Sequence, residues 1–205
     1  MKRLPAVLLA LSCLFLAACG GEGSVETPAP SAEPTAALTE GTGTDREIIS
    51  KGDCFEISLN HAGEIVRYDY VVKTADGKVI ESASCPQQPK VAPLSKTLLG
   101  FRFYNEDKTW CRYYDTEKGL ASPSYFGAFW DNGKLVAYND YEKNQKLVVR
   151  DIFDDAGYKY ELPIDSAAME LIIVAAVPDA EGTSLTVEYL LGESSSRLTA
   201  QLPLA

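Results

Sequence analysis

Few side chains in this sequence are suited to nucleophilic catalysis. Ser and Cys nucleophiles usually need an imidazole base, and His61 is the only histidine. It lies in the stretch 59–63 (LNHAG), which we interpret as a turn between two strands. The sequence also lacks a Gly-x-Ser-x-Gly elbow, a phosphate-binding glycine loop and a His-Glu-x-x-His motif. These absences argue against the common hydrolases and nucleotide-dependent enzymes.

Carboxylates are abundant, so the residue types permit a two-carboxylate glycosidase. Aspartate is also a common turn residue, because its side chain bonds nearby backbone N–H groups. Clustered oxygens would suit calcium, but the stretches 131–133 (DNG) and 154–157 (DDAG) lack the full alternating loop of ligands. We therefore predict no metal site and no cofactor. The candidate carboxylates are Asp131, Asp140, Asp151, Asp154 and Asp155.

Aromatic side chains are the richest remaining feature, with 11 Tyr, 7 Phe and 2 Trp. In a strand, the adjacent pairs 113–114 (YY) and 129–130 (FW) must each place one ring on the outer face. Exposed Tyr and Trp suit sugar rings or partner proteins, whereas burial between packed sheets is the alternative. The candidate ligand-binding residues are Tyr104, Trp110, Tyr114, Trp130 and Tyr138.

Composition excludes two broad classes of protein. The 205 residues include 46% hydrophobic residues, which argues against global disorder. With 19 Lys and Arg against 29 Asp and Glu, the net charge is −10. Nucleic-acid binders need a basic surface, so we predict no nucleic-acid partner.

The N-terminus has the features of an export signal. Two basic residues precede an apolar stretch at 4–18, which is shorter than the ~20 residues that span a bilayer. The stretch continues into 16–19 (LAAC), which resembles the lipobox of bacterial lipoproteins. The resemblance implies cleavage after Ala18, acylation of the Cys19 thiol, and a location on the extracytoplasmic face of a bacterial membrane. An ordinary signal peptide that is cut elsewhere is the alternative.

A polar segment follows the lipobox. Residues 20–45 hold five Gly, three Pro and five acids, with no basic or aromatic residue. Such a composition favours a flexible tether. We therefore divide the chain into a signal peptide at 1–18, a lipidated cysteine with its linker at 19–45, and a single all-β domain at 46–205.

The domain has the period of two that is typical of strands. Leu99, Phe101 and Phe103, for example, alternate with Gly100 and Arg102. Turn dipeptides separate such stretches, so we expect an antiparallel meander of roughly 10–12 strands in repeated hairpins. The wholly apolar run 171–177 predicts a strand that is covered on both faces.

Three of the turns resemble one another and suggest a repeat. The stretches 76–80 (DGKVI), 132–136 (NGKLV) and 181–185 (EGTSL) lie 56 and 49 residues apart, which predicts about three four-stranded units of roughly 50 residues. The stretch 174–189 (VAAVPDAEGTSLTVEY) is similar to the strand–turn–strand signature of TolB-type β-propellers. The resemblance implies a propeller-like arrangement; a β-sandwich or a barrel is the alternative.

Export from the cytoplasm would decide which cysteines remain in the mature protein and whether they can form a disulfide. Cys13 leaves with the signal and Cys19 carries lipid, so Cys54, Cys85 and Cys111 remain in the domain. Outside the cytoplasm, one disulfide among these three with one free thiol is the simplest arrangement, and three free thiols are the alternative.

Together these observations favour a lipid-anchored, non-catalytic module that binds a protein or a glycan. A carboxylate-dependent enzyme acting on polysaccharide is the second hypothesis, and a structural subunit of an envelope assembly is the third.

Overall fold

The alternating sequence folds into antiparallel strands throughout the part of the chain that the structure describes. The computed structural model describes residues 46–62, 64–105, 108–140, 145–164, 170–192 and 196–204. These residues form strands and turns and contain no helix, so the all-β prediction is confirmed. The predicted signal peptide, Cys19 and the linker 20–45 lie outside the described residues.

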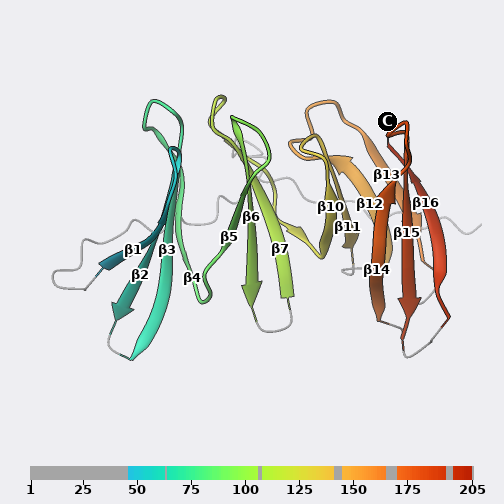
Figure 1. Cartoon of the computed structure of the whole chain (residues 1–205), viewed down its shortest axis with the longest axis horizontal. Coiled ribbons are helices and arrows are strands. Elements are labelled where there is room, and N and C mark those ends of the chain that lie inside the picture. Colours follow the sequence, from blue (N-terminus) through green and yellow to red (C-terminus); the bar gives the residue numbers. More distant parts are fainter. Residues whose placement is uncertain are drawn as a thin grey trace, which may run out of the picture. The chain divides into compact units, whose positions relative to one another are not determined.

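The first half of the domain forms two sheets, in which each strand pairs with the next along the chain (Figure 1). Sheet A contains β1 (Arg46–Lys51), β2 (Phe55–Ala62), β3 (Ile65–Lys73) and β4 (Val79–Cys85). Sheet B contains β5 (Lys90–Pro93), β6 (Leu98–Asn105), β7 (Lys108–Asp115) and β8 (Leu120–Ala121), with β9 (Tyr125–Phe126) also paired to β7.

The second half repeats this plan. Sheet C contains β10 (Ala128–Asp131), β11 (Leu135–Asp140), β12 (Lys146–Asp151) and β13 (Lys159–Pro163). Sheet D contains β14 (Leu171–Pro178), β15 (Ser184–Leu191) and β16 (Leu198–Pro203). The described strands number sixteen rather than 10–12, in part because short strands such as β5 and β10, with four residues, and β8 and β9, with two, show little or no alternation.

Each sheet packs face to face on the next one along the chain (Figure 1). Side chains of sheets A and B share one apolar cluster, centred on Phe101 and Tyr114. Tyr113 and Tyr125 of sheet B join Val136 of sheet C in a second cluster, and sheets C and D share a third. Sheets B and C are thus each packed on both faces.

The described residues do not close into a barrel or a propeller. Their face-to-face sheets agree with the sandwich alternative. The predicted threefold repeat was wrong, since four sheets begin about 40 residues apart. The turn at Gly77 joins the third and fourth strands of its sheet, whereas those at Gly133 and Gly182 join the first and second. All three glycines have positive φ, so the stretches share a turn conformation rather than a place in a repeat.

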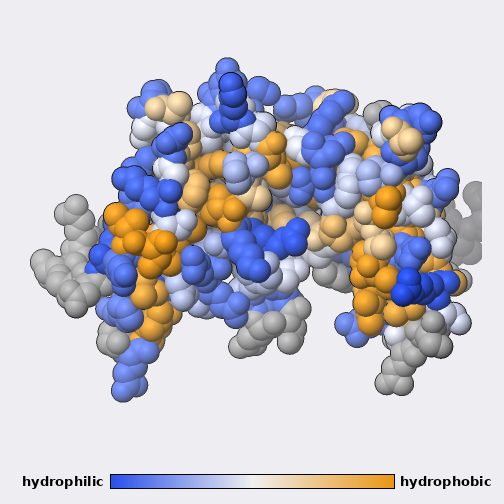
Figure 2. Space-filling model, in the orientation of Figure 1, coloured by the Kyte–Doolittle hydropathy of each residue, from blue (hydrophilic) through white to orange (hydrophobic). Residues whose placement is uncertain are grey.

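Strand β14 differs from its prediction. We expected this apolar run to be covered on both faces, but it is an edge strand of sheet D with one face packed against sheet C. On the other face, Ile172, Val174 and Val177 are 43%, 39% and 59% exposed. Apolar surface accordingly gathers over sheet D in Figure 2.

Removing the Phe101 ring tests the packing of sheet A on sheet B. Phe101 is fully buried and its ring centroid lies 5.1 Å from that of Tyr114 and 5.6 Å from that of Tyr70. We expect Phe101→Ala to lower the free energy of unfolding by ~3–5 kcal/mol in urea titrations, because it leaves a cavity. Phe126→Ala is the control, since Phe126 is 43% exposed. Equal losses for the two variants would contradict this packing.

Acid titration tests the pairing of β12 with β13. Hydrogen bonds from Lys146 at 2.8 Å and Lys159 at 2.6 Å lower the pKa of Glu161 from 4.5 to about 2. A carboxyl group with a depressed folded-state pKa stabilises the fold above its unfolded pKa, and this contribution is lost as pH falls through the folded value. We therefore expect Glu161→Gln to be less stable than the parent above pH ~4.5, with the difference vanishing towards pH ~2.

The measurement is the urea midpoint of the two proteins from pH 7 to pH 2. Glu181→Gln, in the β14–β15 turn, is the control and should follow the parent. A difference between Glu161→Gln and the parent that is constant across this range would contradict the assignment.

Candidate functional site

The five aromatic candidates do not form one surface. Tyr114 is fully buried between sheets A and B, where Trp110 also stacks on Phe103 at 5.3 Å. Trp130 packs against the cluster between sheets C and D, and Tyr138 lies 5.4 Å from Tyr125 between sheets B and C. Burial between sheets therefore accounts for most of these rings. Of the five, Tyr104 lines a cavity that includes Lys90, Arg102 and Asp131, which are suited to binding.

Most of the aspartate candidates serve the fold. Asp151 is buried and accepts a hydrogen bond from the Tyr158 backbone at 2.7 Å. Asp154 pairs with Arg150 at 2.7 Å, and Asp155 pairs with Lys118 at 3.6 Å. Asp140 ends β11, and Asp131 lies at the end of β10 beside the same cavity as Tyr104. In the part of the chain that is described, no group of three or more Asp, Glu, His or Cys is placed to hold a metal ion.

The three cysteines of the domain are free thiols in the structure. Cys85 pairs with Tyr68 on β3, whereas the carbonyl of Cys54 accepts a hydrogen bond from Lys73, five residues further along that strand. This separation is about 17 Å, well beyond the Cα distance of a disulfide. Cys111 lies on the other side of sheet B, in the cluster shared with sheet C. The register thus favours the alternative of three reduced thiols.

The cavity beside Tyr104 is created by the alternation of sheet B. On β6, Gly100, Arg102 and Tyr104 share one face, and the opposite face carries Phe101 and the contacts with sheet A. The β5 partners of Arg102 and Gly100 are Lys90 and Ala92, and their β7 partners are Cys111 and Tyr113. Alternation and register therefore bring seven of the lining residues onto one face.

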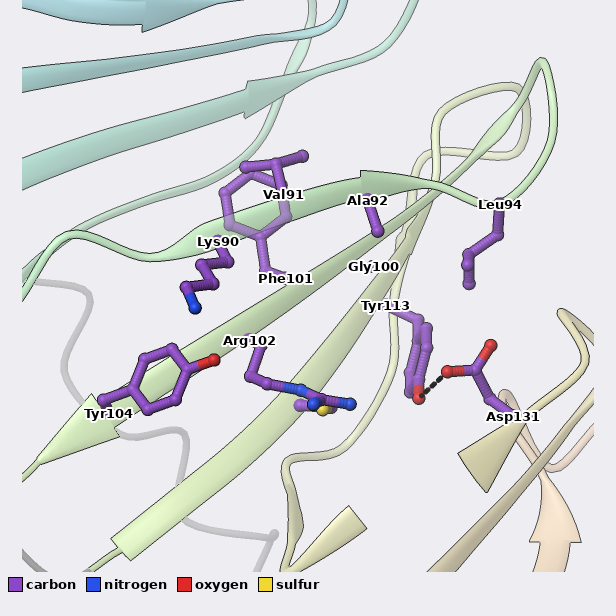
Figure 3. A pocket seen from close by; sticks show the side chains of 11 residues that line it. Lys90, Val91, Ala92, Leu94, Gly100, Phe101, Arg102, Tyr104, Tyr113 and Asp131 are labelled. Carbon is purple, nitrogen blue, oxygen red and sulfur yellow. Dashed lines mark hydrogen bonds between the residues drawn. The ribbon is translucent and has the colours of Figure 1, made fainter. Parts of the chain in front are cut away.

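The resulting hollow has a volume of about 280 Å³, and we call it the B–C cleft (Figure 3). Sheet B supplies its floor and Asp131 of sheet C supplies one wall. Gly100 leaves part of the floor without a side chain: a Cβ at this position would lie in ordinary contact with Leu94 and Tyr113, at 3.4 Å from each. The lining residues are Lys90, Val91, Ala92, Leu94, Gly100, Phe101, Arg102, Tyr104, Cys111, Tyr113 and Asp131.

One end of the B–C cleft is cationic. The Lys90 ammonium lies 5.3 Å from the centre of the Tyr104 ring, a cation–π distance. A hydrogen bond with Cys111 raises the pKa of Arg102, while burial raises the pKa of the Cys111 thiol and keeps it protonated. Within the described residues, neither cation forms an ion pair with a carboxylate.

The other end is acidic. Tyr113 is 1% exposed and its hydroxyl donates a hydrogen bond to Asp131 Oδ2 at 3.1 Å (Figure 3). Burial, and then the charge of Asp131, raise the pKa of Tyr113, so this hydroxyl stays neutral. The cleft thus offers charged and polar groups for binding but no nucleophile activated by a base.

A second hollow, of about 310 Å³, lies near the turns after β7, β10 and β12. Of the two lysines that line it, Lys118 is already paired with Asp115 at 3.8 Å and with Asp155 at 3.6 Å. Asp151, in the same wall, is hydrogen-bonded to the backbone of Tyr158. With these groups engaged, it is the weaker candidate for a binding site.

No protein-family model matches this chain, and no curated protein matches it. In the described residues there is also no helix with the length and apolar character that a membrane crossing requires.

Most of the B–C cleft was not predicted from the sequence. Asp131 and Tyr104 were candidates for different chemistries, Tyr113 entered only as one member of an aromatic pair, and Lys90 and Arg102 were not candidates. Gly100, inside the clear alternation of β6, was the available signal, because a glycine within a strand often marks a hollow or a close approach.

Proposed function

We propose that this chain is a lipid-anchored, extracytoplasmic binding module that holds a small anionic ligand in the B–C cleft without catalysing a reaction. The resemblance of 16–19 (LAAC) to a lipobox supports the anchor. The single observation that carries the binding role is the pair of cations, Lys90 and Arg102, left without carboxylate partners among the described residues of a chain with net charge −10.

Several features of the cleft favour an anion. The planar guanidinium of Arg102 suits a carboxylate or phosphate, to which it donates two parallel hydrogen bonds. The Lys90 ammonium lies over the Tyr104 ring, 5.3 Å from its centroid, which holds a second cation beside the guanidinium. A volume of about 280 Å³ lies just below the range of about 300–1,000 Å³ that is usual for ligand pockets, which favours a small molecule over a polymer.

The same proposal includes an open, propeller-like row of blade-like sheets, which the described residues do not close into a ring. Three of its units are sheets of four or more strands in chain order, and successive units begin about 40 residues apart. Blades of TolB-type and other propellers are four-stranded sheets of similar length that pack face to face. The face-to-face packing of successive sheets supports this reading alongside the sandwich alternative.

The carbohydrate-active alternative is less well supported. A glycosidase needs two carboxyl groups about 5–9.5 Å apart in one cleft. Among the described residues that line the B–C cleft, Asp131 is the one carboxylate. The second hollow is lined by Asp115, Asp151 and Asp155, but the first and last pair with Lys118 and Asp151 accepts a hydrogen bond from the Tyr158 backbone. The envelope-subunit alternative keeps one supporting observation, the exposed apolar face of β14, which a partner protein would cover.

Replacing the lipobox cysteine tests the anchor. We expect Cys19→Ala to appear in the soluble fraction, or as an uncut precursor, because no thiol remains for acylation. The measurement is fractionation of cells followed by a salt wash and an immunoblot for size. Cys54→Ala is the matched control and should stay with the membrane. Salt-resistant membrane binding by a cleaved Cys19→Ala protein would refute the anchor.

Removing the guanidinium of Arg102 tests the binding site. With butyrate as the probe, we expect Arg102→Ala to weaken binding by about tenfold or more, because a charge-assisted hydrogen bond is lost. The measurement is a ligand-observed NMR titration of the full chain in detergent. Arg67→Ala, on β3 of sheet A, removes an exposed arginine outside the cleft and should bind like the parent. Equal binding by both variants would refute this site.

A further inference from the structure

We infer that the ligand of the B–C cleft is a small zwitterion of the amino-acid class, with its carboxylate on Arg102 and Lys90 and its ammonium on Asp131. This inference rests on the proposed binding function and names the chemistry of the same site. It is carried by two opposite charges that share one small cavity without neutralising each other.

The two cations are placed side by side by the register. Lys90 and Arg102 are direct partners across β5 and β6, and both side chains line the cleft. Like charges in directly opposite positions of a sheet repel each other. The Tyr104 ring and the Cys111 sulfur offset this only in part, because neither carries a negative charge. A ligand carboxylate between the two side chains would remove the repulsion and accept hydrogen bonds from both.

The carboxylate of Asp131 belongs to the neighbouring sheet. Its Oδ2 accepts one hydrogen bond from Tyr113, which leaves further lone pairs for a donor. Asp131 lines the same cleft as Lys90 and Arg102, yet no ion pair joins it to either of them in the described structure. Figure 3 shows Arg102, Tyr113 and Asp131 around one hollow.

Ligands of other classes would satisfy only part of this site. A plain anion would leave Asp131 without a counter-charge, and a dianion would add repulsion beside it. A neutral sugar would leave all three charges uncompensated. Between the poles, Gly100, Ala92 and Leu94 offer a small, largely apolar floor, which suits a short aliphatic chain. A molecule with a carboxylate at one end and an ammonium at the other would pair with Lys90 and Arg102 and with Asp131.

The test compares ligands that differ by one charge. Butyrate and 4-aminobutyrate share a chain and a carboxylate, but only the second carries an ammonium group. Glycine and 6-aminohexanoate vary the spacing of the two charges, and the N-acetyl derivative of each amino acid removes the positive charge. We expect at least one of the three amino acids to bind the full chain about tenfold more tightly than its N-acetyl derivative and than butyrate.

Variants then locate the ammonium group. We expect Asp131→Asn, which keeps the shape of the side chain, to lose that tenfold preference while butyrate binds at least as tightly as before, because a negative charge is removed from the cleft. Tyr113→Phe, which removes only the hydrogen bond to Asp131, should lower the preference less. Asp140→Asn, at the end of β11 and outside the lining of the cleft, is the matched control. Thermal melting of each variant verifies that it is folded.

The outcomes separate this inference from the proposed function. If butyrate binds through Arg102 and every amino acid binds no better than its N-acetyl derivative, the zwitterion is refuted and the anion site remains. If no probe binds, or if Arg102→Ala changes nothing, both are refuted. A preference for the amino acids that persists in Asp131→Asn also refutes the assignment of the ammonium to this carboxylate.

Discussion

Sheet B is packed on both faces, and the arrangement of the whole domain depends on how its strands divide their side chains between two neighbours. On β6, Leu99, Phe101 and Phe103 turn towards sheet A, so that face is built of large apolar rings. The residues between them turn towards sheet C. Because side chains in a strand alternate strictly, a shift of one residue would exchange these two faces and place Arg102 in the core.

The B–C cleft follows from this division. The face of sheet B that meets sheet C is apolar near Tyr113 and Tyr125, where the two sheets share a buried cluster. Further along, Gly100 has no side chain to fill the space, and Arg102 and Lys90 cannot be buried without partners. The contact between the sheets therefore gives way to a hollow lined by charged groups. The same face of sheet B thus packs against sheet C in one region and lines the cleft in another.

Sequence periodicity identified clear strands such as β6, but it did not predict which sheets pack against them. The alternation around Phe101 identified β6 correctly, but the run 171–177 shows the limit of the method. Its unbroken apolar character predicted cover on both faces, whereas β14 is an edge strand with Ile172 and Val177 exposed. The hydropathy of a residue indicates whether its burial would be favourable. The arrangement of the sheets decides whether a second layer is present to bury it.

Local pattern was enough to predict the all-β class and the alternation of clear strands such as β6, because alternation and turn chemistry act over a few neighbouring residues. It did not give every strand, since residues 59–62, interpreted as a turn, belong to β2. The sequence singled out Tyr104 and Asp131, but with no reason to place them together. Tertiary structure decided that Asp131 of sheet C faces Lys90 and Arg102 of sheet B, and that Tyr114 is buried while Tyr104 lines a cavity. These relations join residues far apart in the chain, and they depend on register and sheet packing, which no local pattern encodes.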